Sequence, residues 1–191
     1  MSASPLSLLV ALVSGILTWT LLEYLLHRFF GHHRALVRRS PFGIEHTAHH
    51  SKGDYFAATW KKASAAAVVL ALMTPLSMSL LGLGNGLAYS ASFVSFYLVY
   101  EWLHRRLHTA EGVGPYGRWA RRHHFFHHFH DPSKNHGVTS PLWDWVFGTA
   151  ATAPRITVPE KLAMRWLVDA ESGDVHRHLQ GRYDLRRAKK G

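Results

Sequence analysis

Several features are missing from this 191-residue sequence, and their absence narrows its chemistry. It contains no cysteine, so these residues include no rubredoxin or iron–sulfur module. It also contains neither a glycine-rich dinucleotide-binding fingerprint nor the H-E-x-x-H helix that zinc hydrolases often use. We therefore disfavour a zinc-dependent hydrolase, and we expect any electrons used by this chain to come from a separate carrier.

Apolar residues are concentrated in three runs. The first, residues 5–26, has about 22 residues and would be ~33 Å long as a helix, which matches the hydrocarbon core of a bilayer. No basic residue precedes this run and no small-residue cleavage site follows it, which favours a transmembrane helix over a cleaved signal peptide. Residues 63–81 and 86–103 form two further runs, joined by the sequence Gly-Leu-Gly-Asn-Gly. They predict a membrane hairpin, with two buried helices of a soluble protein as the alternative.

The distribution of charge favours the membrane interpretation. All Lys and Arg residues lie within residues 28–62 and 105–190, at the exit of the first run and on both flanks of the hairpin. Positive charge beside membrane spans marks the cytoplasmic side. We therefore expect an all-α, multi-pass integral membrane protein with about three transmembrane helices, an outside amino terminus and a cytoplasmic helical cap. The net charge of +10 then indicates anionic headgroups, and not nucleic acid, as partners of the basic surface.

Histidine is frequent, with 16 residues, and four short motifs contain most of them. Two motifs have the spacing H-x-x-H-H, and positions i, i+3 and i+4 share one face of a helix. Each triplet is therefore expected to direct three imidazoles at a single point. The other two motifs are pairs, four and five residues apart. The candidate metal ligands are His27, His32, His46, His49, His50, His104, His108, His124, His127 and His128.

This set is too large for one metal ion, because transition-metal sites use about three to five protein ligands. All its members lie on the cytoplasmic side of the predicted spans, which predicts a dimetal centre at the inner membrane face. A histidine-lined metal transporter would instead place ligands along the spans. His104 and His108 can share one helix face, whereas His27 and His32 cannot do so on an uninterrupted α-helix. We therefore expect a helix end at Gly31.

Four further residues could support the histidines. Glu23 and Glu101 are the acidic residues within the predicted spans, where an ionisable side chain is costly and often functional. Each lies about one turn before a candidate ligand, so its carboxylate could accept a ring N–H or bind metal itself. The alternative is that both carboxylates reach interfacial water. His123 and His136 lie beside the motifs and could also contact the site.

The motifs resemble those of the integral-membrane fatty acid hydroxylase and sterol desaturase superfamily of histidine-rich di-iron oxygenases. The matching sequences are HRFFGH, HTAHH, HRRLH and HFFHH, followed by NHGVTSPLWDWVFGT at residues 135–149. The resemblance implies a membrane hydroxylase domain over residues 1–150, in which the ten histidines bind two iron ions. Zinc can replace iron in such a site during purification. The resemblance also implies dioxygen as co-substrate and a membrane lipid as substrate.

Within that superfamily, carotenoid hydroxylases look to have four residues between the histidines of the third motif, whereas HRRLH has three, like acyl-lipid 2-hydroxylases and sterol-modifying members. The resemblance therefore implies hydroxylation of an acyl chain or a related lipid. A lipid or sterol desaturase and a carotenoid hydroxylase stay as alternatives within the superfamily. A ferredoxin-like or cytochrome carrier, with its reductase, would dock on the basic cytoplasmic surface.

Residues 151–191 have a different character and are interpreted as a basic cytoplasmic tail. Pro154 and Pro159 bracket a linker, and residues 160–168 predict a short amphipathic helix. Its apolar side chains would contact the membrane surface or the body of the protein.

Overall fold

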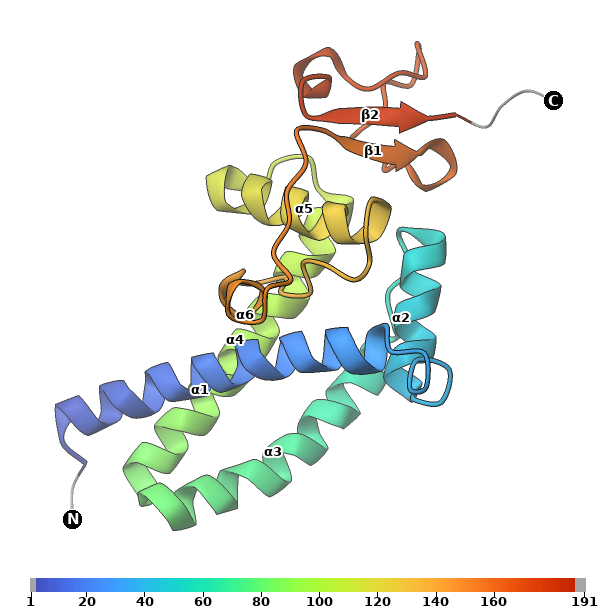
Figure 1. Cartoon of the computed structure of the whole chain (residues 1–191). Coiled ribbons are helices and arrows are strands. Elements are labelled where there is room, and N and C mark those ends of the chain that lie inside the picture. Colours follow the sequence, from blue (N-terminus) through green and yellow to red (C-terminus); the bar gives the residue numbers. More distant parts are fainter. Residues whose placement is uncertain (1–2, 188–191) are drawn as a thin grey trace. The chain divides into compact units, whose positions relative to one another are not determined.

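The computed structural model describes residues 3–187 and is mostly helical (Figure 1). The chain divides into two compact units: residues up to 23 together with 57–102, and residues 24–56 together with 103 onward. The elements are α1 Pro5–Leu25, the π-helix η1 Leu26–Gly31, α2 Pro41–Lys52, α3 Thr59–Leu81, α4 Leu83–Thr109, α5 Gly114–Phe129, α6 Leu142–Val146, β1 Ile156–Pro159, the short 3₁₀ helices η2 Glu160–Leu162 and η3 Arg177–Leu179, and β2 Tyr183–Arg186.

Within residues 3–187, two helices are long and apolar enough to cross a membrane. They cover Pro5–Gly31 and Thr59–Leu81, with mean hydropathies of 2.0 and 1.9. Only 22% and 6% of their apolar windows are buried, so most of these side chains point outward, as contact with lipid requires. The third predicted run lies within α4, and its role as a span stays a prediction.

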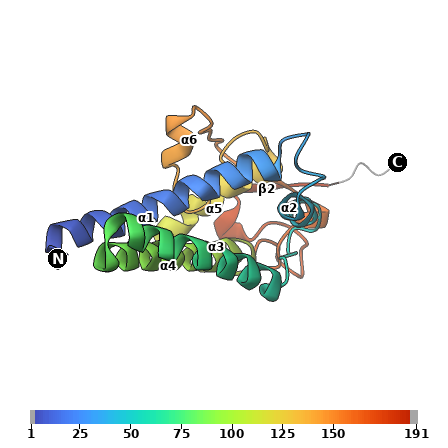
Figure 2. The same ribbon diagram turned by 90° about the horizontal axis from the view of Figure 1, so that it is seen from below.

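At the predicted hairpin the structure has two consecutive helices, α3 and α4, which meet at a tight turn and diverge from it in Figure 1. In Figure 2 they are seen from below. Their insertion in a membrane as a hairpin stays a prediction. The turn is tighter than expected, because α4 already begins at Leu83 and Gly82 alone takes a positive φ, of 78°. The Ser77 hydroxyl hydrogen-bonds the Ser90 hydroxyl at 2.9 Å and donates to the Gly86 carbonyl at 3.1 Å. Polar groups on these apolar helices therefore pair with one another, as lipid surroundings demand.

Helices α1 and α4 approach closely within the first unit. A Cβ at Gly15 would lie 2.1 Å from the Ser92 Oγ and 2.3 Å from the Tyr89 carbonyl oxygen. One turn further, the Trp19 ring packs edge-on against Phe93, with 5.5 Å between ring centroids. Glycine is therefore required at position 15 by the approach of another backbone.

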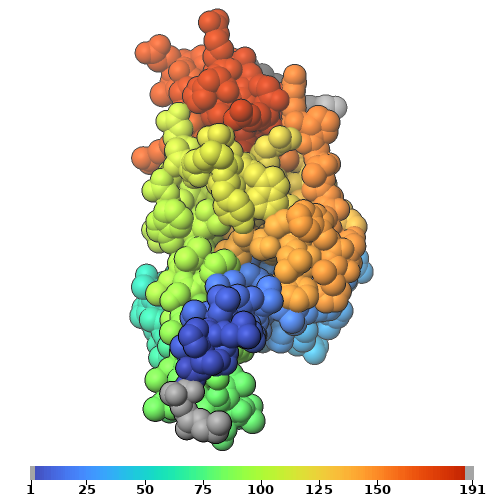
Figure 3. Space-filling model, turned by 90° about the vertical axis from the view of Figure 1, so that its left-hand side faces the viewer, coloured from blue at the N-terminus to red at the C-terminus, as the bar shows by residue number. Residues whose placement is uncertain are grey.

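The second unit contains a small sheet that the sequence did not predict. Strands β1 and β2 pair in parallel, with Ile156 opposite Tyr183. They belong to the segment after residue 150, which covers α5 in Figures 1 and 3, where α5 is yellow and residues 178–187 are red. The expectation of a wholly α-helical protein is corrected by this sheet.

The short amphipathic helix expected at residues 160–168 is also wrong. Only the 3₁₀ turn Glu160–Leu162 forms there, and Ala163 is extended. Met164, Trp166 and Leu167 instead enter the core that covers Phe125. The conformation of this segment is therefore determined by burial of its apolar side chains against α5. It is not determined by an amphipathic helix that contacts a membrane. Residues 188–191 of the predicted tail lie outside the described residues.

Replacing Gly15 with Leu tests the close approach of α1 and α4. We expect a loss of about 1–3 kcal/mol of unfolding free energy, because the new side chain must displace Ser92 and the Tyr89 backbone. The higher helix propensity of Leu relative to Gly would by itself raise the unfolding free energy. Val13→Leu, on the exposed face of the same helix, is the matched control. Unfolding in detergent measures both variants, and equal stabilities would contradict this packing.

Candidate metal centre

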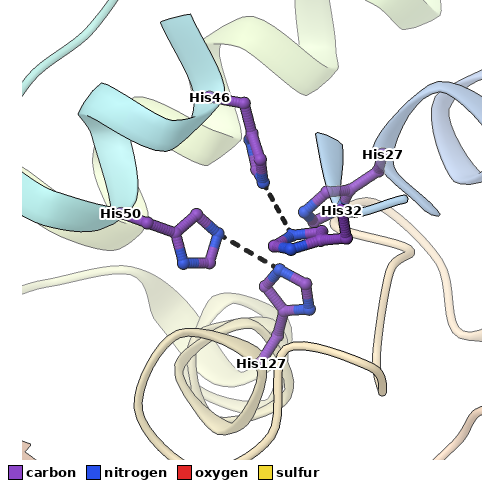
Figure 4. A group of neighbouring side chains, drawn as sticks. All are labelled: His27, His32, His46, His50 and His127. Carbon is purple, nitrogen blue, oxygen red and sulfur yellow. Dashed lines mark hydrogen bonds between the residues drawn. The ribbon is translucent and has the colours of Figure 1, made fainter. Parts of the chain in front are cut away.

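The structure brings all ten predicted histidines together in the second unit, in two groups of five. Within each group, one ring nitrogen from every residue lies within 4.8 Å of the others. Each group could therefore hold a metal ion. Group 1, drawn in Figure 4, contains His27, His32, His46, His50 and His127. Group 2 contains His49, His104, His108, His124 and His128.

Each H-x-x-H-H triplet is divided between the two groups, so the expectation that a triplet converges on a single point is wrong. In α2, His46 and His50 belong to group 1 and His49 belongs to group 2. At about 100° per residue, positions i and i+4 differ by about 40° around a helix, whereas i+3 and i+4 differ by about 100°. The second triplet follows the same rule, because His124 and His128 share group 2 while His127 joins group 1. Helices α2 and α5 thus each supply both groups.

The five-residue spacing of His27 and His32 is explained by the π-helix η1. A π-helix bonds position i to i+5, which brings side chains five residues apart to the same side. The two rings lie 5.3 Å apart, and His32 caps the end of η1. The predicted helix end after Gly31 is confirmed, although Gly31 itself belongs to η1. A Cβ at Gly31 would lie 2.9 Å from His46 Cδ2, so glycine is required there to let His46 approach.

The Nε2 atoms of the histidines converge in pairs. Two neutral imidazoles at such distances can share only one proton, whereas a cation between them would accept both lone pairs. The Nε2–Nε2 distances are 2.8 Å for His32 and His46, 3.2 Å for His50 and His127, 3.0 Å for His49 and His104, and 3.0 Å for His108 and His124.

Backbone carbonyls orient three of the rings. The Nδ1–H groups of His49 and His127 donate to the carbonyls of Tyr55 and Lys134, each at 2.7 Å. His27 Nδ1 donates in the same way to the His136 carbonyl. A carbonyl can only accept, so these bonds place the proton on Nδ1 and leave the Nε2 lone pair facing the group. The rings are therefore fixed in the tautomer that a metal ligand needs.

The histidines are held in their neutral form. Burial and, after it, the charges of neighbouring histidines lower the pKa well below the usual 6.5 for His46, His50, His124, His127 and His128. Neutral imidazole is the metal-binding form, so these side chains need not lose a proton at pH 7 before they bind an ion.

Several buried ring nitrogens have no hydrogen-bond partner among the described residues: Nε2 of His27, Nδ1 of His124, and both nitrogens of His128. Each unpaired buried polar group costs about 1–3 kcal/mol. Bound cations would compensate this cost through the nitrogen atoms that face them. The donor set, its neutrality and these unpaired atoms all fit a pair of transition-metal ions.

Asp144 organises the loop that supplies two of the orienting carbonyls, and sequence reasoning did not single it out. Its buried carboxylate accepts hydrogen bonds from the His136 and Gly137 amides at 2.8 and 2.9 Å and from the Thr149 hydroxyl at 2.7 Å. Burial alone would raise the pKa of the Asp144 carboxyl, but the hydrogen bonds from His123, Thr149 and Gly137 outweigh it and lower that pKa. The feature of the sequence that could have indicated this role is the position of an aspartate between two tryptophans, in the sequence WDW.

Two of the predicted supporting histidines lie in the second unit. His123 contacts Asp144, with 3.1 Å between Nε2 and Oδ2. The His136 ring lies 5.5 Å from that of His27 and 5.3 Å from that of His127, although His136 belongs to neither group. Its backbone carbonyl, and not its ring, orients His27.

The predicted supporting glutamates lie in the first unit. The Glu101 carboxylate forms an ion pair with Lys62. Glu23 is buried, with 4% of its surface exposed. A role for either carboxylate beside the histidines stays a prediction.

Comparison with known proteins gives a match over most of the chain. A sequence profile described as fatty acid hydroxylase matches residues 12–149. Dihydroceramide fatty acyl 2-hydroxylase FAH2 of Arabidopsis thaliana is 32% identical over 137 residues, which cover 71% of this chain and 58% of the relative. Fatty acid 2-hydroxylase of Rattus norvegicus is 29% identical over 76% of this chain and 41% of its own length. This chain thus spans less than two thirds of either relative.

A solved structure of full-length scs7p, in which only the hydroxylase domain is visible, has a similar fold. Its TM-score is 0.59 with 26% sequence identity, and the match covers 78% of this chain and 58% of that one.

Replacing Asp144 with Asn tests the support that the loop gives to group 1. The Asn amide nitrogen cannot accept the hydrogen bonds that Oδ2 now receives, so we expect a loss of about 1.5–3 kcal/mol of stability and faster loss of bound metal to a chelator. Asp54→Asn, at an exposed position, is the control. Thermal unfolding and metal analysis after chelator treatment measure both effects. Wild-type metal retention in Asp144→Asn would show that the loop does not hold the ligands.

Proposed function

Because this chain belongs to the fatty acid hydroxylase family, we propose that it is an oxygen-dependent di-iron lipid hydroxylase. It would insert a hydroxyl group into a C–H bond of an acyl chain or a related membrane lipid. The observation that carries this proposal is the pair of adjoining five-histidine groups in the second unit.

The geometry of the groups supports two ions that act together. The His50 and His128 rings, one from each group, stack with 4.0 Å between centroids and 3° between planes. Imidazole suits iron, and ten neutral ligands leave the positive charge of the ions in place. A bound iron pair would supply reductive activation of dioxygen, with one oxygen atom entering the C–H bond and the other leaving as water.

The protein's part is to hold the ligands and to exclude water. His124 and His127 are fully buried, and the Asp144 loop and the carbonyl bonds fix ring directions before any ion arrives. Such a fixed, dry environment protects a reactive oxidant from side reactions with solvent. The residues that we propose as iron ligands are His27, His32, His46, His50 and His127 for one ion and His49, His104, His108, His124 and His128 for the other.

Exposed apolar side chains next to group 1 support an approach by lipid. Trp145, Val146 and Phe147 on and after α6 are 66%, 60% and 46% exposed. The Phe147 ring stacks on Tyr24 at 5.2 Å, and the Tyr24 ring meets that of His136 at 5.6 Å. A lipid surface touching α6 would therefore be separated from group 1 by three side chains, those of Phe147, Tyr24 and His136. The names of the relatives favour carbon 2 of a fatty acyl chain as the position that is hydroxylated.

The cellular arrangement follows from the same proposal. The chain would be a multi-pass membrane protein with its amino terminus outside and its dimetal centre on the cytoplasmic face, where the Lys and Arg residues gather. A ferredoxin-like or cytochrome carrier, docked on the basic surface, would deliver the electrons. The gathering of the histidines in one unit does not favour a metal transporter, which needs ligands along its path.

Replacing His127 with Ala tests the enzyme directly, because that change removes one ligand of group 1. We expect product formation to fall by about a hundredfold or more, since metal-centred chemistry depends on the ligand set. His33→Ala is the control, because His33 is exposed and belongs to neither group. Lipid mass spectrometry of cells grown with ¹⁸O₂ should show one labelled oxygen atom in a lipid with the wild type and His33→Ala only.

Two results would contradict the proposal. A lipid that loses two hydrogen atoms and gains no oxygen would identify a desaturase. Metal transport without any oxygen-dependent change in lipid would remove the enzyme interpretation.

A further inference from the structure

A pocket of about 1210 Å³ lies in the second unit, and none of the ten grouped histidines lines it. One wall is α5, and the other walls are residues 151–156 and 178–183 (Figure 3, yellow, orange and red). Arg118 and Arg122 line it from one face of α5, because they are one turn apart. At about 100° per residue, this face points about 150° away from the face that carries His124, His127 and His128. The pocket is therefore distinct from the metal centre.

The lining is strongly basic. Arg118 and Arg182 are exposed, and neither has an ion-pair partner among the described residues. The Arg122 guanidinium donates to the Ala153 and Pro154 carbonyls at 2.7 and 3.1 Å, which fixes its position in the pocket wall. The acidic residue of the lining, Glu111, already contacts His178, with 3.3 Å between carboxylate and ring nitrogen. The pocket therefore carries uncompensated positive charge.

The hydroxyl-bearing side chain of Tyr183 also lies beside this charge. Tyr183 lines the pocket although only 4% of its surface is exposed, and its hydroxyl makes no hydrogen bond with another described residue. Arg121, Arg122 and Arg182 lie close enough to act on it electrostatically. At the open side, Trp119 is 38% exposed and stacks on His123 with 5.2 Å between ring centroids. An unpaired hydroxyl and an aromatic face thus accompany the free guanidiniums.

We propose that this pocket binds an anionic ligand that carries a phosphate group. Arg118 and Arg182 would grip the phosphate oxygens with their planar guanidiniums, and the Tyr183 hydroxyl would donate a hydrogen bond to it. The volume exceeds that of phosphate alone and suits a larger phosphorylated compound. Two sources share this chemistry, a soluble compound such as a nucleotide and the headgroup of an anionic lipid.

The proposed site is independent of the hydroxylase reaction. Two of its three walls lie beyond residue 149, where the match to the family profile ends. The C-terminal segment, with its small sheet packed on α5, thus completes a binding site as well as a core.

The test uses the full chain in detergent micelles, titrated with pyrophosphate in a calorimeter. We expect saturable binding that weakens about tenfold or more in the double variant Arg118→Gln/Arg182→Gln, because each lost guanidinium removes charged hydrogen bonds. The double variant Arg165→Gln/Arg186→Gln has the same change in net charge at exposed positions outside the pocket and should bind like the wild type. If the first variant unfolds, Arg118→Lys/Arg182→Lys is the alternative. It keeps the charge but removes the paired donors of the planar guanidinium groups, so it should still weaken binding.

Two further titrations identify the source of the phosphate. Adenosine diphosphate represents soluble compounds, and phosphatidylcholine vesicles with phosphatidic acid represent the lipid headgroup. Binding of either probe that is lost selectively in the pocket variant supports the site and names its source. Equal affinities in both double variants, or no saturable binding of any probe, would overturn the proposal.

Discussion

Ten clustered imidazoles, six of them buried and four half-buried, would repel one another if they were protonated, and in the neutral form they direct nitrogen lone pairs at one another. Burial lowers the pKa of His46 and His127 well below the usual 6.5, which favours the neutral form whose lone pairs can face the interior of each group. Cations placed at those lone pairs would compensate their desolvation. The second unit therefore offers two places where positive charge from bound ions would be stabilised.

Much of the surrounding backbone follows from this requirement. The π-turn of η1 allows residues five apart to serve one group, and Gly31 leaves room for His46. The buried Arg121 guanidinium donates to the Leu107 carbonyl at the end of α4, and it lies 3.8 Å from the Trp166 ring. The Trp166 indole N–H in turn donates to the His108 carbonyl at 2.8 Å. The C-terminal segment thus buttresses the helix that carries two ligands of group 2.

Spacing and predicted topology selected ten histidines from the sequence, and the structure brings these ten together. Their role as metal ligands stays a prediction. The two helices α3 and α4 could also be predicted from the sequence, because its apolar runs are long and flank a glycine-rich turn. The division of each triplet between the two groups could not be predicted from the sequence, since it depends on how α2 and α5 face each other. Asp144 was missed because its partners are backbone amides and a distant histidine, which no local pattern encodes. The β1–β2 sheet arises from packing on Phe125 and leaves no strong strand period in the sequence.

X-ray absorption spectroscopy of the purified, iron-loaded chain, combined with its iron content, tests the central claim most directly. The account predicts two iron ions per chain, each in a shell dominated by imidazole nitrogen, because each group presents five histidines and no carboxylate. A single iron per chain, or a shell dominated by carboxylate oxygen, would contradict it.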